Sequence, residues 1–279
     1  MSTDNISLNA SVRNVLLSLQ RTDSDMSVVQ GRLASGKRVA SAIDDPVNYF
    51  RAKNLYDTAD DLFSLKDGIT NAMNTVKTAT DGLTAIEGVL KQMKGLAEQA
   101  KASSVAADRT AFKTQYDALR TQLDKIASDS TYDGVNLIKG TPDSLTVTFN
   151  RDGSASMSVT GTASDATGLA VTAAGDWGNA TLATGTAAID ADIALLSTAM
   201  STVRSTAATL GSSNSLLKIR SDFTKNMITT HRAGADDLTN ADMNDESAKL
   251  LALQTRSQLA LNSLSMANQS AQGVLRLFG

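Results

Sequence analysis

The stretch "VRNVLLSLQRTDSDMSVVQGRLASGKR", residues 12–38, decides how the chain begins. Its seam positions advance in alternating steps of three and four residues, which is the spacing of a coiled coil. The pattern predicts a helix that breaks at Ser35-Gly36 and buries one stripe against another helix. The residues of this stripe are Val12, Val15, Leu19, Thr22, Met26, Val29 and Leu33.

The end of the same stretch has the glycine spacing of a phosphate-binding loop, since Gly31 precedes a Gly-Lys pair by four residues. Such a loop needs a Ser or Thr after the lysine to hold Mg²⁺, and a strand before it. Here Arg38 follows Lys37, and a helix precedes them. We therefore interpret both cations as charges at the carbonyl end of a helix, available to Asp44 or Asp45 or to a neighbouring copy of the chain. The alternative is a solvated turn.

Composition excludes several classes of function. The chain has no cysteine and one histidine, so thiol chemistry and cysteine or paired-histidine metal sites are excluded. Its 26 basic and 29 acidic residues are mixed along the chain, so we expect no nucleic-acid or membrane binding. The first twenty residues lack the pattern of a cleaved secretory signal. Aromatic residues make up only 4%, which favours long helices packed side by side.

The heptad signal returns at greater length between residues 62 and 100. One set of positions is Leu62, Ile69, Val76, Leu83, Leu90 and Ala97, and the other is Leu65, Ala72, Ala79, Ile86, Met93 and Ala100. A third helix is predicted after Asp108 as its N-cap, with apolar residues from Phe112 to Ile126. The short gap between these helices predicts an antiparallel helical hairpin.

The composition changes to Thr, Ser, Gly, Ala and Asp between residues 140 and 186. Two alternating segments, "SLTVTFN" and "SASMSV", flank "NRDG" and predict a β-hairpin. The remainder, which includes Trp177, is consistent with further short strands or with a loop. We interpret it as a small surface-exposed excursion rather than a binding site.

Helical spacing resumes at Ile189 and continues towards Ile228, breaks at "HRAGADDLTNADMNDE", and returns in a last helix from Leu250 to Val274. The predicted fold is mainly α, with long antiparallel coiled-coil helices from both termini and a small central insert that contains a β-hairpin.

Several motifs resemble bacterial flagellin, the subunit of the flagellar filament. "LASGKRVASAIDD", residues 33–45, is similar to the N-terminal pattern of that family, although Pro46-Val47-Asn48 follows it instead of Ala-Ala-Gly. "NADMNDE", residues 240–246, and "LSMANQSAQGVLRLFG", residues 264–279, resemble its C-terminal motifs. The polar family-motif residues are Arg38, Asp44, Asp45, Asn268, Gln269 and Gln272.

The resemblance implies a structural subunit without catalytic activity or cofactor, which is exported unfolded by the flagellar type III apparatus and polymerises outside the cell. It implies an inner-tube helix, 1–40, paired with another, 245–279; an outer helical domain, 41–140 with 187–244; and a surface insert, 141–186. The implied polymerisation seam adds Leu253, Leu264, Ala267, Val274 and Leu275 to the N-terminal stripe. Implied partners are copies of the chain, an export chaperone, the filament cap and the hook–filament junction proteins.

The segment "LKQMKGLAEQA", residues 90–100, resembles the stretch of flagellin that an innate immune receptor recognises. This chain has Gln92 in place of an arginine and Gly95 in place of a glutamate, between Lys91 and Lys94. An amide cannot replace the bidentate contacts of a guanidinium, so we expect weak receptor recognition.

Two alternatives differ in kind. A hook–filament junction protein has flagellin-like termini but forms a short ring. An enzyme would have to use Lys37 or the adjacent Asp44 and Asp45, which lack a second perturbed group and a predicted cleft.

Overall fold

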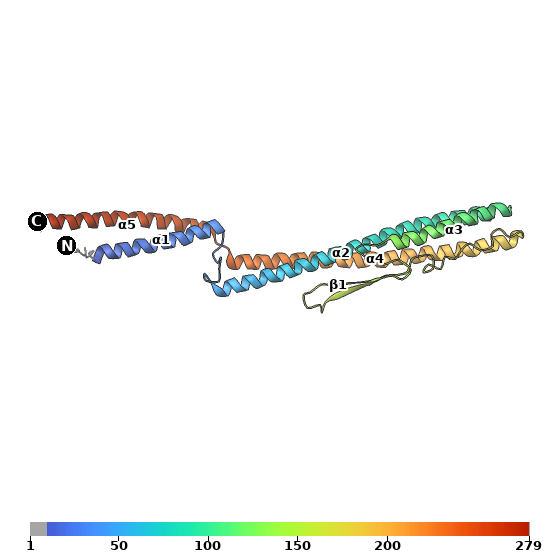
Figure 1. Cartoon of the computed structure of the whole chain (residues 1–279), viewed down its shortest axis with the longest axis horizontal. Coiled ribbons are helices and arrows are strands. Elements are labelled where there is room, and N and C mark those ends of the chain that lie inside the picture. Colours follow the sequence, from blue (N-terminus) through green and yellow to red (C-terminus); the bar gives the residue numbers. More distant parts are fainter. Residues whose placement is uncertain (1–9, 279) are drawn as a thin grey trace, which may run out of the picture. The chain divides into compact units, whose positions relative to one another are not determined.

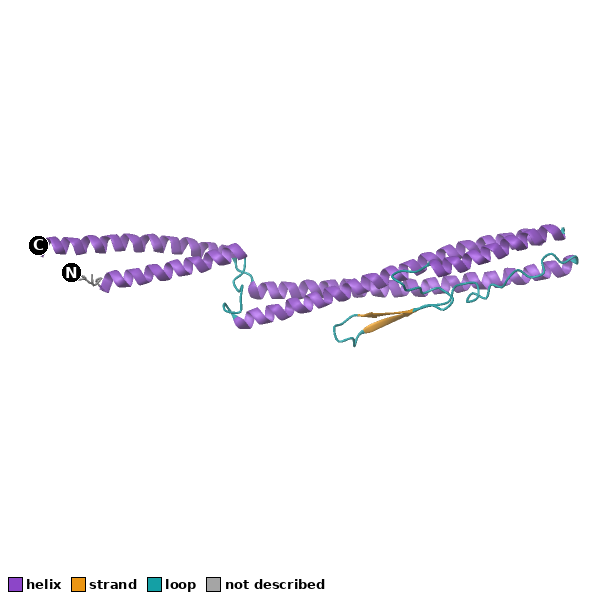
Figure 2. Ribbon diagram, viewed as in Figure 1, coloured by secondary structure: helices purple, strands orange, loops and turns teal. Residues whose placement is uncertain are grey.

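The computed structural model describes residues 10–278, with the side chains of residues 12–267 and of Gln269. Its elements are α1 (Ala10–Ser35), α2 (Pro46–Ala102), α3 (Ala106–Asp129), β1 (Ser144–Thr148), β2 (Ser156–Thr160), α4 (Leu182–Thr239) and α5 (Met243–Phe278). Helices dominate the described chain, and one antiparallel hairpin lies in its middle (Figure 2). The predicted fold class is confirmed.

The chain divides into two compact units. One is built from the described residues up to Thr58 and from Thr230 onward, and the other from Ala59–Thr229. The helices α2 and α4 contribute residues to both units.

In the first unit, α1 and α5 run antiparallel side by side, so the first turns of α1 lie beside the later part of α5 (Figure 1). Val12 and Val29 of α1 are buried against α5. The predicted helix break at Ser35 is also confirmed, because α1 ends there and Gly36 adopts a φ of 69°. A side chain at Gly36 would be strained in this left-handed conformation.

In the second unit, the core lies between α2, α3 and α4. The α2 residues that it contains are Ile69, Ala72, Val76, Ala79, Leu83, Ile86, Leu90, Met93, Ala97 and Ala100. These are the two predicted heptad sets from Ile69 onward. Since many of them are alanine, the helices approach closely and the buried area per residue is small.

Several helices are longer than predicted. The helix α3 begins at Ala106 with Val105 as its N-cap, so the prediction of Asp108 as the N-cap was wrong. We expected the second helix from Leu62, but α2 begins at Pro46, which is favoured in the first helical turn. Asp45 accepts a hydrogen bond from the Asn48 N–H at 3.1 Å, as an N-cap does. The buried positions in this early part are Ala52 and Ala59, whose small side chains give a weak apolar signal.

The predicted break after Ile228 was wrong over most of its length. The helix α4 continues through His231 to Thr239, and only residues 240–242 separate it from α5. A Cβ atom at Gly234 would lie 3.6 Å from the Leu55 side chain, so this glycine faces α2 within the first unit. Small residues that favour close packing were mistaken for residues that end a helix.

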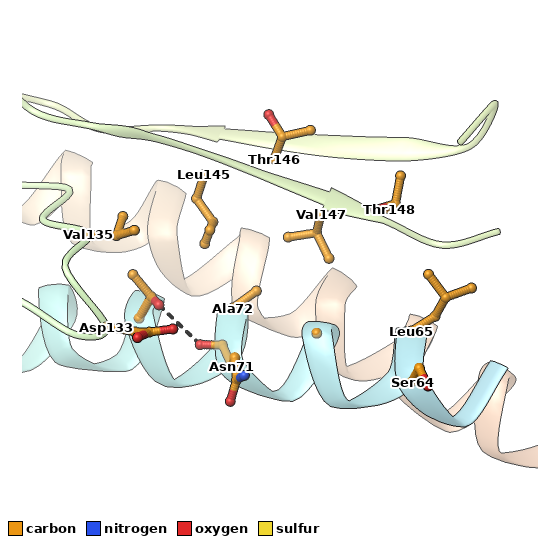
Figure 3. Close-up of a pocket in the computed structure, with 12 residues that line it drawn as sticks. Ser64, Leu65, Asn71, Ala72, Asp133, Val135, Leu145, Thr146, Val147 and Thr148 are labelled. Atoms are coloured by element: carbon orange, nitrogen blue, oxygen red, sulfur yellow. Dashed lines mark hydrogen bonds between the residues drawn. The ribbon is translucent and has the colours of Figure 1, made fainter. Parts of the chain in front are cut away.

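The predicted β-hairpin is confirmed, with Leu145 opposite Val159 and Val147 opposite Met157. Leu145 and Val147 point towards α2, whereas Thr146 points away from it (Figure 3). A groove of about 330 Å³ lies between the hairpin and α2. The hairpin therefore covers part of α2 with one apolar face and presents hydroxyl groups on the other.

Residues 161–181, for which the sequence left the fold open, form an extended strap along α3. A row of polar α3 side chains one turn apart holds the main chain of this strap. Asp124 accepts from the Ala166 N–H (2.8 Å), Arg120 donates to Val171 O (2.8 Å), Asp117 accepts from the Ala174 N–H (2.9 Å), Lys113 donates to Gly175 O (2.9 Å), and Arg109 donates to Trp177 O (2.7 Å). We call these five side chains the α3 polar row.

Trp177 fastens the strap between α3 and α4. The prediction of an exposed excursion was wrong here, because Trp177 is fully buried. Its ring packs edge-on against the ring of Tyr116, with the two ring centroids 5.0 Å apart. Its Nε1–H donates to Asp192 Oδ2 at 2.6 Å. Asp192 also accepts from the Gly175 N–H at 3.0 Å.

We predict that Asp192→Ala destabilises the second unit by about 3 kcal/mol, because the buried Trp177 Nε1–H and the half-buried Gly175 N–H lose a charged acceptor. Urea unfolding followed by the fluorescence of Trp177, the only tryptophan, measures this loss. Asp190→Ala is the matched control. Asp190 is half-exposed and pairs with Lys101 at 2.6 Å, so its removal should cost less than about 1 kcal/mol. Equal effects of the two substitutions would contradict the role given to Asp192.

Candidate assembly surface

The predicted seam faces inward between α1 and α5. On α1, Val12 and Val29 are buried, and Val15, Leu19, Met26 and Leu33 are half-buried. On α5, Leu253, Leu264 and Ala267 are half-buried, each in the expected register. Val274 and Leu275 lie in α5, but their side chains are outside those described. The same holds for Asn268 and Gln272, whereas Gln269 is exposed.

One seam position on α5 is charged. Glu246 lies one helical turn before Leu250 in the stripe, and its side chain is only 3% exposed. Its Oε1 lies 3.3 Å from Arg32 Nη1 and 3.5 Å from Lys249 Nζ. Its Oε2 is buried without a hydrogen-bond partner. The sequence marked this residue only as part of a family motif and gave no sign of its burial.

The outward side of the helix pair carries large apolar side chains. Leu251, Leu259 and Met266 of α5 are more than 60% exposed, and Leu17 of α1 is 51% exposed. From Leu250 onward the chain carries only two charged residues, both arginines. Several large apolar side chains exposed along one helix, with few charges among them, are typical of an interface with another protein.

The two chain segments that leave α1 and enter α5 are tied together by their main chains. The Arg38 N–H donates to Thr239 O at 2.7 Å, and the Ala241 N–H donates to Gly36 O at 2.9 Å. The Arg38 guanidinium donates to Leu238 O at 3.1 Å, at the carbonyl end of α4. Arg38 is thus a C-terminal cation of α4 rather than of the helix before it, and its charge also helps to lower the pKa of Asp45. We call this tie the clasp.

Asp44 and Asp45 instead order the loop that leads into α2. Asp44 accepts from the N–H of Ser41 at 2.8 Å and from its hydroxyl at 3.0 Å, and these bonds hold the pKa of Asp44 below 3.8. The Asn48 N–H and side chain bind Asp45 and lower its pKa in the same way. Ile43 beside them is 94% exposed.

The segment that resembles a receptor-binding stretch lies in the second unit. Gln92 and Lys91 are exposed, while Lys94 and Gly95 are half-buried. Lys91 contacts Glu87 at 3.0 Å, and Glu87 also accepts from Arg204, which together hold its pKa below the ordinary value. The exposed part of the segment is therefore a helical surface on which Lys91 is ion-paired and Gln92 faces solvent.

The part of the chain that the structure describes shows no group of three or more His, Asp or Glu side chains that could hold a metal ion. Within the same part, none of the helices has an apolar stretch that would span a membrane. Gly31 lies inside α1, so the residues with phosphate-loop spacing have no strand before them.

Comparison with known proteins accounts for this arrangement. Residues 6–143 match the bacterial flagellin N-terminal helical region, and residues 193–278 match the bacterial flagellin C-terminal helical region. The chain belongs to the bacterial flagellin family. It is a structural subunit that self-assembles into the extracellular flagellar filament with which bacteria swim. The matches are to flagellins, and none favours a hook–filament junction protein.

Two of the similar proteins match over the whole length. Flagellin FljM of Caulobacter vibrioides is 33% identical over 279 residues, covering 100% of both chains, and flagellin FljK of the same organism is 33% identical over 285 residues. Flagellin A of Rhizobium meliloti is 47% identical over 74 residues, 26% of this chain and 19% of that protein. The alignment with a crystal structure of Bacillus cereus flagellin covers 56% of this chain and 88% of that chain. The sequence identity is 21% and the TM-score is 0.48. This chain is a short flagellin of the α-proteobacterial type.

We predict that Asp44 titrates with a midpoint below 3.8 in the folded chain, as followed by carboxyl-carbon NMR. Since the folded-state pKa is lowered, the loop is stabilised above the unfolded pKa, and this stabilisation is lost as the pH falls through the folded value. Ser41→Ala removes one donor to Asp44 and should raise its midpoint. Asp45, held by Asn48, should not move and serves as the internal control. A midpoint of Asp44 at or above 3.8 in the unsubstituted chain would contradict the assignment.

Proposed function

We propose that α1 and α5 supply the inner tube of the filament, and that their exposed apolar faces bind the same helices of neighbouring copies. The observation that carries this proposal is the row of exposed large side chains on α5, from Leu251 through Leu259 to Met266. A homopolymer offers each copy the same surfaces, so head-to-tail burial of such a face can extend without limit.

The proposed division follows from the same helices. Residues 1–40 and 245–279 form the inner tube, residues 41–140 and 187–244 form the outer helical domain, and residues 141–186 form the surface insert. The compact unit that contains α1 and α5 supports the first part, although it reaches further along α2 and α4. Ala52 and Ala235 are buried in that unit beyond the proposed boundaries.

We further propose that the subunit leaves the cell unfolded through the flagellar type III apparatus, with an export chaperone, and that it adds to the filament at the cap beyond the hook–filament junction proteins. The long helices support this route, because their alanine-rich seams are weak in isolation and gain stability from lateral packing. We propose no nucleic-acid partner, no membrane partner and no catalytic activity.

Seeded assembly tests the proposed inner tube. Purified chain mixed with filament fragments should grow long helical filaments in electron micrographs. Leu259→Asp should reduce filament growth by roughly tenfold or more, because a charge would be buried in an apolar interface. Leu259→Met is the matched control and should grow normally. Normal growth of the Asp variant, or rings from the unsubstituted chain, would count against the proposal.

Weak recognition by the innate immune receptor for flagellin is also part of the proposal. Gln92 is exposed on α2 and offers an amide where recognised flagellins offer a guanidinium. A side chain added at Gly95 meets no atom within 4 Å of its Cβ, so a glutamate fits there without disturbing the helix.

We predict that purified monomer activates receptor-reporter cells weakly, and that the double substitution Gln92→Arg and Gly95→Glu raises the response by roughly tenfold or more. The double substitution Gln92→Lys and Gly95→Glu controls for charge alone. It should raise the response less than the variant with arginine does. Potent activation by the unsubstituted monomer would refute the expectation.

A further inference from the structure

Glu246, the charged residue in the α1–α5 seam, is unusual because its burial contributes little to the stability of the helix pair. Glu246 is buried with one oxygen bound to Arg32 and the other without a partner. Burying a carboxylate costs free energy that one ion pair repays only in part, so a leucine of similar size would give a more stable seam. A buried polar group in a coiled coil is best known for fixing register.

The rest of the seam specifies register weakly. Thr22 on α1 and Ser257 and Ala260 on α5 occupy stripe positions, and such small or polar side chains pack almost equally well against each other after a slide of seven residues. Such a slide moves a helix by about 10.5 Å and restores the heptad pattern. Apolar packing alone therefore leaves alternative registers close in free energy.

The charges along the pair distinguish these registers. Asp25 lies seven residues before Arg32, and both line one groove on the helix pair together with Lys249. Asp25 also lines the next groove, together with Arg256. In the observed register, Asp25 therefore shares these grooves with Lys249 and Arg256 of α5, and Glu246 pairs with Arg32 of α1.

A slide of one heptad in one direction brings Glu246 level with Asp25, so that two carboxylates meet in a partly buried seam and repel each other. A slide in the other direction carries Glu246 past Ser35, the last residue of α1, and leaves Arg32 without its acidic partner. Both shifted registers are thus opposed by charge.

We propose that Glu246 sets the register of α1 against α5, because Arg32 attracts it in the observed register and Asp25 would repel it in a shifted one. The neighbouring cation Lys249 contributes by binding both Glu246 and Asp245, and this contact with Asp245 raises the pKa of Lys249. Asp245 is exposed and faces away from the seam. The role of Glu246 is one of specificity, and it comes at some cost in stability.

Two disulfide reporters test the proposal in the full chain, which has no cysteine of its own. Met26→Cys with Leu253→Cys joins seam positions that lie level when Arg32 faces Glu246. Leu19→Cys with Leu253→Cys joins positions that become level only after the slide towards Asp25. A disulfide needs Cα atoms about 4.4–6.8 Å apart, so each pair reports one register. Mild oxidation followed by non-reducing electrophoresis and peptide mapping measures both yields.

The chain with Glu246 should form the 26–253 bond and little of the 19–253 bond. Glu246→Arg should lower the ratio of the 26–253 yield to the 19–253 yield by roughly tenfold or more. An arginine at this position is repelled by Arg32 and attracted by Asp25. Asp81→Arg makes the same charge change at an exposed position of the second unit and should leave the ratio unchanged.

Glu246→Leu separates register from stability, since it should keep or raise the helical content in circular dichroism while the same ratio falls. If the ratio stays within about twofold in both Glu246 variants, the clasp or the apolar seam sets the register and the proposal is overturned. If Glu246→Arg loses its helical content, the Glu246→Leu ratio decides alone.

Discussion

Long helices with narrow, small-residue seams depend on lateral contact, and that dependence governs the whole chain. The core of α2 includes Ala72, Ala79, Ala97 and Ala100, which bury little area each and make an isolated helix of this length marginal. The second unit meets the demand internally, with α3 and α4 packed on α2. In the terminal pair, α1 and α5 cover only one side of each other. Leu251 and Leu259 on the other side remain exposed.

The strap shows how a weak helical core can be completed without strands. Every contact from the α3 polar row reaches main-chain atoms of the strap, so the row fixes the path of the strap while constraining few of its side chains. Arg109 is buried and donates to the carbonyls of Ser103, Trp177 and Asn179, which satisfies its charge inside the unit. Trp177 then adds a large buried ring, which packs against the buried ring of Tyr116.

The sequence predicts what periodicity encodes and little else. The heptads of α1 and α2 and the alternation of Leu145 and Val147 place apolar side chains at fixed intervals, so both the helices and the hairpin were predictable. The strap was not, because side-chain bonds to a main chain leave no periodic signature. The length of α4 was missed because Gly234 serves close packing there, and sequence alone cannot separate that use from a helix end. Site residues divide likewise: the apolar seam followed from spacing, whereas the burial of Glu246 depends on a partner helix more than two hundred residues away.

The α1–α5 pair buries a charged side chain and exposes large apolar ones, which is the reverse of the usual distribution. Glu246 is buried in the seam, while Leu259 and Met266 face outward. A monomer designed for its own stability would exchange them, since burying the leucine and exposing the carboxylate would lower the free energy of the isolated pair. The observed arrangement suits a subunit whose outer face is covered by its neighbours: the apolar side chains then supply association energy in the polymer, and the one place where charge can still discriminate between registers is the seam inside each subunit.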